Sequence, residues 1–232
     1  MQYKITGSTM PVLELALARG ESVIAESGEF SWMDDDVQMN TATSGGASAG
    51  GLFGALGRVI SGGSLFMTEY RAARDGAGVA FAARVPGSIE KVDVAQGRDY
   101  LVHKHGFVCA TPGVRYGVGV QQKLGSGIFG GDGFILQRLS GEGTAFVELG
   151  GECVVRDLAP GEAIRVHPHH VGMFEARVAF DIALIRGIRN ALFGGDGLFQ
   201  ARLTGPGRVW LQGLTVSRLA HDIAPYLPPK SA

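Results

Sequence analysis

Two stretches of this sequence repeat each other at a distance of 64 residues. The motif Phe-Gly-Gly-Asp-Gly occurs at 129–133 and again at 193–197, and in both places a leucine and two glycines follow at the same spacing. The aromatic positions keep this step, because Phe146 corresponds to Trp210. A fixed period with matching glycines predicts one supersecondary unit that is used more than once. The following residues are Leu139, Gly141 and Gly143 in the first stretch and Leu203, Gly205 and Gly207 in the second.

A second set of landmarks extends the repeat toward the N-terminus. The segment 92–97 corresponds to 156–161 at the same distance, and 15–20 has the same apolar alternation ending in a glycine. Gly20 and Gly97 are 77 residues apart, 13 more than the period, and the surplus is expected in a glycine-rich insert near 44–60. We therefore predict one compact unit of three repeats and a tail. The predicted boundaries are 1–85, 86–149 and 150–214 for the repeats and 215–232 for the C-terminal tail.

Short runs of apolar or alternating residues between glycines predict β-strands in each repeat. Examples are 12–17, 144–149 and 208–212. The 37 glycines supply the positive-φ turn residues that many short antiparallel strands require. Helix is compatible with only two segments, 52–60 and 216–223. The predicted fold class is all-β with few short helices.

The composition limits the partners that the chain can attract. With 232 residues, 45% of them hydrophobic, it can bury a sizeable core. A net charge of −1 with 19% charged residues provides no basic field, so we expect no nucleic-acid partner. Cys109 and Cys153 occupy non-equivalent places in the repeats and are expected to be reduced. Because no apolar signal segment follows Met1, we expect a cytoplasmic protein.

Several separated motifs resemble one known family. They are the segment 20–30, the glycine-rich insert, the two Gly-Asp-Gly turns and the segment 205–212. Over about residues 3–214 these features are similar to the altered-inheritance-of-mitochondria (mitochondrial biogenesis) family, whose domain is TRAP-like. The resemblance implies a double-stranded β-helix type of β-sandwich, named after the ring-forming tryptophan RNA-binding attenuation protein. It implies no catalytic residues, and without a transit peptide the chain resembles the bacterial members, which have no established reaction.

Four histidines form the candidate metal site. His103 and His105 in the second repeat, and His167 and His169 in the third, each follow a glycine with the spacing Gly-x5-His-x-His. On a strand this spacing directs both imidazoles to one face, and histidine is a common ligand of zinc, nickel and copper. The pattern resembles the first metal motif of cupins, but the second cupin motif is not found, and Pro168 also allows an exposed turn. We therefore expect no metal and no other cofactor, with a cupin-like metal protein using these histidines as the alternative.

The apolar part of the insert is the candidate interaction surface. It contains too much apolar surface to leave in water, yet it is too short to span a bilayer. It is expected to pack against its own sandwich, a partner subunit or a membrane interface. Open sheet edges and three repeats lead us to expect a homo-oligomer, a trimer or a hexamer, with peripheral membrane contact as the other option. The apolar residues are Leu52, Phe53, Leu56, Val59 and Ile60.

Two enzyme-like motifs lack the context that their chemistry needs. Residues 125–130 spell GxGxxG without a following helix, and 46–50 spell GxSxG in a chain without βαβ units. We therefore predict a non-enzymatic β-scaffold or assembly protein. RNA binding, a further alternative suggested by the fold, is disfavoured because the lysines and arginines form no basic stripe interleaved with aromatic residues.

Overall fold

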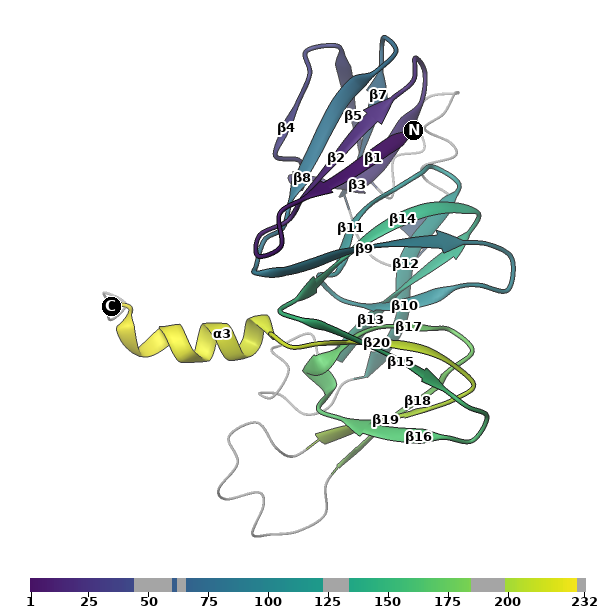
Figure 1. The fold of residues 1–232 in the computed structure, drawn as a ribbon, viewed down its shortest axis with the longest axis vertical. Coiled ribbons are helices and arrows are strands. Elements are labelled where there is room, and N and C mark those ends of the chain that lie inside the picture. The colour runs from purple at the N-terminus through teal and green to yellow at the C-terminus, as the bar shows by residue number, and fades with distance from the viewer. Residues whose placement is uncertain (44–59, 62–65, 123–133, 185–198, 229–232) are drawn as a thin grey trace.

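The computed structural model describes residues 1–43, 60–61, 66–122, 134–184 and 199–228. In these residues the chain forms four β-sheets and one α-helix, which confirms the predicted all-β class. The sheets are stacked along the long axis of the molecule, and the chain passes from the N-terminal end of the stack to the other end (Figure 1). Neighbouring strands are antiparallel, except that β6 and β12 are parallel.

Each sheet combines strands that are distant in the sequence. In spatial order, the first sheet contains β1 (Gln2–Thr6), β2 (Val12–Leu17), β8 (Ala77–Ala82) and β4 (Trp32–Met33). The second contains β5 (Val37–Thr43), β7 (Phe66–Ala72), β3 (Ser22–Glu26), β11 (Phe107–Ala110), β14 (Gly143–Gly150) and β9 (Gly87–Val94). The third contains β15 (Cys153–Leu158), β20 (Gly207–Gln212), β17 (Val171–Glu175), β10 (Tyr100–His103), β13 (Phe134–Gly141), β12 (Val114–Gln122) and β6 (Ile60–Ser61). The fourth contains β16 (Ala163–Val166), β19 (Phe199–Thr204) and β18 (Ala179–Leu184).

Hydrophobic cores fill the three spaces between successive sheets, so the molecule is a multilayered sandwich. Their burial supplies the main driving force for folding. The first core includes Leu15, Tyr70 and Phe146, the second includes Tyr116, Leu149 and Met173, and the third includes Leu136, Phe174 and Leu203.

The burial pattern of each strand follows from the number of its faces that are covered. In β2 of the first sheet, exposed Glu14 lies between buried Leu13 and Leu15, because only one face of this sheet meets a core. In β14 of the second sheet, the last six residues are all buried, because this sheet has a core on each face. Alternating and continuous apolar runs in the sequence therefore reflect outer and inner sheets.

The strand pairing of residues 86–149 recurs 64 residues later, and we refer to 1–85, 86–149 and 150–214 as the first, second and third tiers. Val94 of β9 pairs with Gly143 of β14, and Leu158 of β15 pairs with Gly207 of β20. In the second tier, the register of β11 against β14 shifts between the first and third residues of β11. The register of β17 against β20 shifts at the same place in the third tier.

One turn glycine occupies the same place in every tier. Gly20, Gly97 and Gly161 follow the strands β2, β9 and β15, and their φ angles are 82°, 77° and 79°. Only glycine adopts such angles without strain, which explains why this landmark is visible in the sequence. The matching Phe-Gly-Gly-Asp-Gly motifs at 129–133 and 193–197 lie outside the described residues.

The tiers are joined by backbone pairing, so they form one continuous body. In the second sheet, Ile24 of the first tier pairs with Ala110 of the second. In the third sheet, β10 of the second tier pairs with β17 of the third. The insert adds a further link, because β6 at its C-terminal end pairs with β12, with Ile60 opposite Tyr116.

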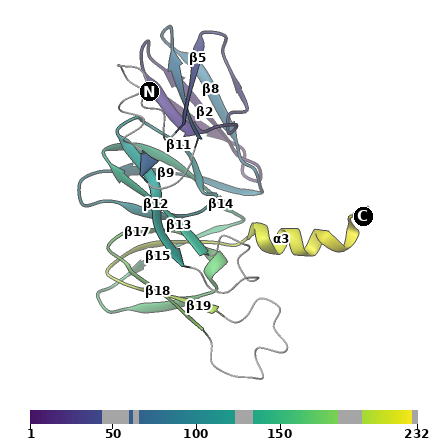
Figure 2. The ribbon, with the colours of Figure 1, turned by 180° about the vertical axis from the view of Figure 1, so that it is seen from behind.

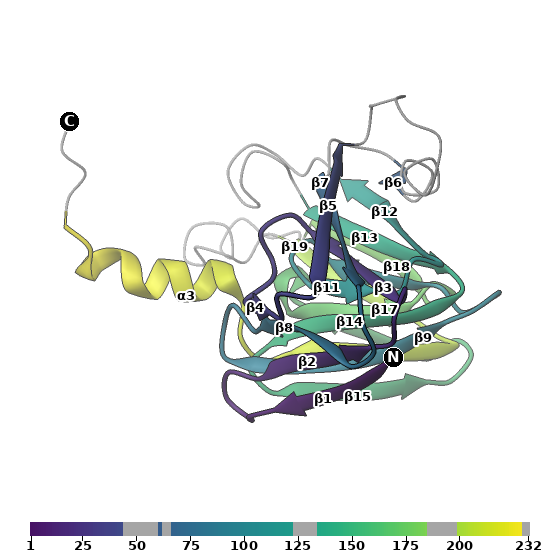
Figure 3. The ribbon, with the colours of Figure 1, turned by 90° about the horizontal axis from the view of Figure 1, so that it is seen from above.

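The helix α3 (Val216–Ile223) begins where the sequence predicts it and projects from the side of the stack (Figures 1 and 3). The hydroxyl of Thr215 caps it by accepting a hydrogen bond from the backbone N–H of Arg218 at 3.2 Å. A short 3-10 helix, η2 (Ala224–Tyr226), continues it, and no residue of either element is buried. The view from behind shows the same projection (Figure 2). Within the described residues, no helix is long and apolar enough to cross a membrane.

Candidate functional site

A cavity of about 540 Å³ lies where the end of the first tier, the second and third tiers and the start of α3 meet. We refer to it as the junction pocket. Its size is within the range of small-molecule sites, and most of its wall is apolar. Its lining residues are Arg84, Val85, His103, Lys104, His105, Phe134, Ile135, Glu148, Gly150, Pro168, His169, Val171, Gln212, Leu214, Thr215, Val216 and Ser217.

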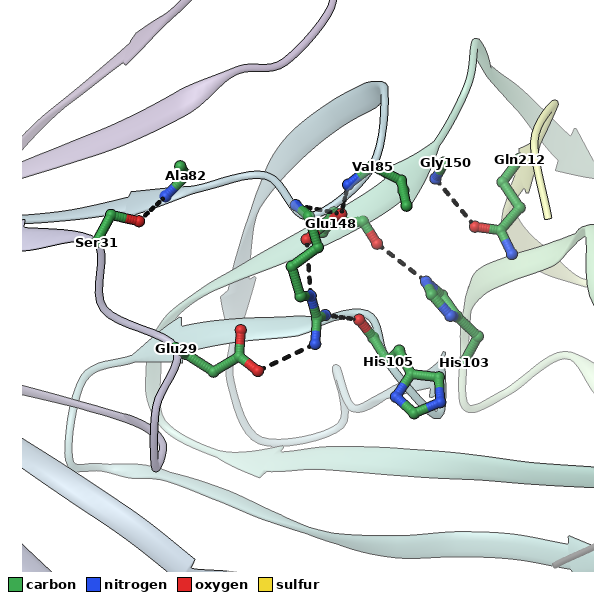
Figure 4. Close-up of polar contacts among 10 residues, drawn as sticks. Glu29, Ser31, Ala82, Val85, His103, His105, Glu148, Gly150 and Gln212 are labelled. Atoms are coloured by element: carbon green, nitrogen blue, oxygen red, sulfur yellow. Dashed lines mark hydrogen bonds and ion pairs between the residues drawn. The ribbon is translucent and has the colours of Figure 1, made fainter. Parts of the chain in front are cut away.

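A buried carboxylate organises one wall of the junction pocket (Figure 4). Glu148 on β14 is 4% exposed. One of its oxygens accepts hydrogen bonds from the backbone N–H groups of Arg84 at 3.0 Å and Val85 at 3.2 Å. The other accepts from Nε of Arg84 at 3.3 Å. These donors offset the cost of burying the negative charge.

The guanidinium of Arg84 connects this carboxylate to two other segments. Its Nη1 donates to Glu29 at 3.0 Å, and its Nη2 donates to the backbone carbonyl of His105. Burial raises the pKa of Glu29, and the nearby Arg84 partly opposes that shift. Arg84 therefore joins Glu29 of the first tier to β14 and to the turn that carries His105, both in the second tier.

Gln212 takes the place of Glu148 in the third tier, 64 residues later. Its Oε1 accepts from the backbone N–H of Gly150 at 3.1 Å, and its Nε2 donates to the carbonyl of His169 at 2.8 Å. The amide thus supplies both the acceptor and the donor, whereas the second tier uses a carboxylate together with an arginine. Arg84, Glu148 and Gln212 were not predicted from the sequence as site residues. The equal spacing of Glu148 and Gln212 was the available signal.

The predicted histidines meet at the junction pocket, although not on paired strands. His103, His105 and His169 line the pocket, and the ring of His167 lies 5.4 Å from that of His169 between centroids. His103 is the last residue of β10, and a turn follows it. In the third tier, β16 ends at Val166 and a 3-10 helix, η1 (Pro168–His170), follows. The prediction that each His-x-His pair lies on one strand is therefore wrong, because the chain turns within both motifs. The turn in the third tier is not fully exposed, since Pro168 is buried.

Two of the imidazoles near the pocket are held by backbone carbonyls. Nε2 of His103 donates to the carbonyl of Glu148 at 3.0 Å, so its Nδ1 is the unprotonated nitrogen of the neutral ring. Nδ1 of His170, a residue that was not predicted as part of the site, lies 2.7 Å from the carbonyl oxygen of Gln212. Among the residues that the structure describes, no three side chains of His, Cys, Asp or Glu are grouped to hold a metal ion. The geometry thus offers no argument for the cupin-like alternative.

The partly buried imidazole of His103 predicts a loss of stability in mild acid. Burial lowers its pKa to about 4, with Arg84 and His105 acting in the same direction and the bond to Glu148 opposing them. The neutral ring is favoured by folding, so its contribution is complete above pH 6.5 and is lost as the pH falls toward 4. We expect the free energy of unfolding to fall by about 2 kcal/mol from pH 6.5 to about pH 5.

Urea unfolding at these two pH values measures this loss. His103→Gln, which keeps an N–H donor for the carbonyl of Glu148, is expected to remove most of it. The control His221→Gln changes an exposed histidine on α3 and is expected to retain it. A parent protein that is equally stable at both pH values would show that folding does not favour the neutral form of His103.

The predicted interaction surface lies mostly outside the described residues. Leu52, Phe53, Leu56 and Val59 are not described, and Ile60 is described through its backbone in β6. That strand pairs with β12 of the same chain, so the C-terminal end of the insert joins its own sheet and is not helical.

Comparison with known proteins gives a family match over almost the whole chain. Residues 3–214 match the family described as "Mitochondrial biogenesis AIM24". An uncharacterized protein of Streptococcus pyogenes serotype M6 is 27% identical over 235 aligned residues, which cover 100% of this chain and 93% of the relative.

A crystal structure of a Streptococcus pyogenes protein has the same fold. Its TM-score with this chain is 0.76 at 24% sequence identity, and the alignment covers 97% of this chain and 99% of that one. At this identity the match shows the fold alone.

Proposed function

Since the chain belongs to the mitochondrial biogenesis AIM24 family, we propose that it is a non-enzymatic scaffold that assembles with further copies of itself. The relative named above is uncharacterized, so the comparison supplies no reaction. A cytoplasmic location is part of the proposal and is supported by the unpaired Cys109 and Cys153. We also propose that the three tiers derive from one repeated unit. The strand registers shared by the second and third tiers, and the turn glycine found in all three, support this.

The observation that carries the proposal is the exposed apolar stripe of α3. Val216, Leu219 and Ile223 recur at helical spacing, and Leu227 continues the stripe beyond the helix. Val216, Ile223 and Leu227 are between 45% and 61% exposed, and Leu219 is half-buried. A helix of eight residues is marginal in water by itself, so packing of this stripe against a partner would stabilise it.

The polar side of α3 favours a protein partner over a lipid surface. It carries Arg218 and Asp222, which form an ion pair at 3.6 Å, and no lysine. Helices that lie on anionic membranes are rich in lysine and arginine, and this helix lacks such an excess. We therefore assign a second copy of the chain as the occupant of the stripe, with the two helices packed about a twofold axis. Of the trimer and the hexamer expected from the sequence, a hexamer with dihedral symmetry contains such contacts.

Charged substitutions in the stripe are expected to dissociate the assembly. In the double variant Leu219→Asp/Ile223→Asp, association through the stripe would bury two carboxylates on each helix, so we expect the mass in solution to fall by half, from a hexamer to a trimer. Size-exclusion chromatography with light scattering measures this mass. The matched control Ser217→Asp/His221→Asp adds two carboxylates at the same spacing on the polar side and is expected to remain associated.

Two outcomes would overturn this assignment. One is a parent protein that is already a single chain, and the other is a stripe variant that keeps the parent mass. Vesicle co-sedimentation provides the membrane comparison. A monomeric parent that binds anionic vesicles through the stripe would make α3 a membrane-contact helix instead.

A further inference from the structure

We propose that Tyr226 of one copy of the chain occupies the junction pocket of a second copy. This contact rests on the twofold packing of α3 proposed above, to which it adds a binding site. Val216 belongs both to the stripe of α3 and to the wall of the pocket, so a helix that packs along the stripe also reaches the pocket.

The segment that follows α3 presents an exposed aromatic side chain. Tyr226 is 87% exposed, more than any other large hydrophobic residue that the structure describes. Pro225 restricts the backbone beside it, and so does the turn of η2, which a hydrogen bond from the N–H of Leu227 to the carbonyl of Ala224 closes at 3.2 Å. Because such a segment loses little backbone freedom on binding, it is suited to serve as an anchor.

Tyr226 is too far from the junction pocket of its own chain to fill it. The helix α3 spans about 12 Å along its axis, at ~1.5 Å per residue, and it leads away from the sheets (Figure 3). Val216 at its start lines the pocket, whereas Tyr226 follows its end. Tyr226 therefore meets a junction pocket only in another molecule.

Antiparallel packing of two α3 helices brings Tyr226 to the pocket of the second copy. A twofold axis that crosses the helices makes them antiparallel, and the opposite partial charges at their ends then lie side by side. In such a pair the end of each helix lies beside the start of the other. Tyr226 of one copy is then next to Val216 of the other, at the pocket wall. The axis repeats the contact, so each copy gives one tyrosine and receives one.

The polar groups of the pocket suit a neutral occupant. The Arg84 guanidinium already pairs with Glu148 and Glu29, so these charges are matched within the chain. The amide of Gln212 donates one of its two N–H groups to the carbonyl of His169. Its other N–H group is a neutral donor for a hydroxyl oxygen. A tyrosine has the matching chemistry, because its ring is apolar and its hydroxyl forms hydrogen bonds without carrying a charge.

The inserted ring enlarges a contact that would otherwise be small. The stripe offers few apolar side chains on each copy, whereas stable interfaces use about 20–30 residues on each side. The pocket wall adds further apolar surface, and buried tyrosines are frequent among the residues that contribute most to binding. The apolar residues of the wall include Val85, Ile135, Val171, Leu214 and Val216.

Photocrosslinking locates the side chain in the assembled protein. With p-benzoylphenylalanine in place of Tyr226, irradiation is expected to join two chains, and mass spectrometry to place the bond in peptides of the pocket wall that contain Ile135 or Val171. The same probe in place of Trp32, an exposed aromatic residue of the first sheet, is expected to form no bond to these peptides. Bonds from position 226 to another surface, bonds within one chain only, or none at all would overturn the assignment.

Dilution of the assembled protein measures what the side chain contributes. Tyr226→Ala is expected to raise, by at least about tenfold, the concentration at which the mass falls by half, while Tyr226→Phe keeps the ring and is expected to dissociate close to the parent. A Tyr226→Ala protein that dissociates like the parent would overturn the inference. If Leu219→Asp/Ile223→Asp still halves the mass in that case, the twofold contact of α3 is retained and only the pocket contact is wrong. A parent that is a single chain would overturn both.

Discussion

Replacement of Glu148 by alanine is expected to lower the free energy of unfolding by about 2–4 kcal/mol, because this buried carboxylate accepts from two backbone N–H groups and from the partly exposed Arg84 guanidinium. The variant leaves the backbone N–H groups of Arg84 and Val85 without their acceptor. It also leaves the Arg84 guanidinium with one fewer carboxylate at the place where the first and second tiers meet. Donors that lose their acceptor lower the free energy of unfolding further, because water replaces the lost hydrogen bonds only in part at a buried position.

Urea unfolding followed by circular dichroism measures the loss. The control Glu142→Ala removes an exposed carboxylate between β13 and β14, and its effect is expected to stay within about 0.5 kcal/mol. Glu148→Gln keeps an acceptor for the two backbone groups but removes the charge, so we expect an intermediate loss of about 1–3 kcal/mol. A Glu148→Ala protein as stable as Glu142→Ala would show that this carboxylate does not hold the tiers together.

Replacement of Phe146 by alanine is expected to destabilise the protein by about 3–5 kcal/mol, as for other buried aromatic residues. Phe146 is 1% exposed in the first core, and its ring meets that of Tyr3 edge-on at 5.3 Å between centroids. Because β14 belongs to the second tier, the loss would weaken the contact between two tiers. Trp210 occupies the corresponding position on β20, is 9% exposed and meets Tyr100 at 6.0 Å.

The stability losses of the Phe146→Ala and Trp210→Ala variants test both the core and the proposed repeat. If the tiers derive from one unit, Trp210→Ala is expected to cost about as much as Phe146→Ala. Trp32→Ala provides the control, since Trp32 is 52% exposed and its removal is expected to cost far less. Phe146→Ala and Trp32→Ala proteins of equal stability would contradict the assignment of Phe146 to the core.

Local and periodic features were readable from the sequence. Short apolar runs and frequent glycines predicted an all-β chain, because strand period and positive-φ turns are properties of a few neighbouring residues. The helix at 216–223 was readable for the same reason. The resemblance over about residues 3–214 rested on separated motifs and was also within reach of the sequence, as the family match over these residues confirms.

The joining of tiers and the composition of the site depended on contacts between distant residues. Nothing near Arg84 in the sequence indicates that its side chain meets Glu148 and Glu29, which are 64 and 55 residues away. The spacing of the histidines likewise indicated a metal-binding pattern. Which ring nitrogen donates a hydrogen bond is decided by carbonyl groups on other strands, such as the carbonyl of Glu148 for Nε2 of His103. By itself the sequence determined the strands, the turn glycines and the period, because these follow from backbone conformation and local hydrophobicity. Only the tertiary structure decided which strands share a sheet, where the junction pocket lies and which of its polar groups are already paired, because burial and hydrogen bonding there require segments that the chain brings together only when folded.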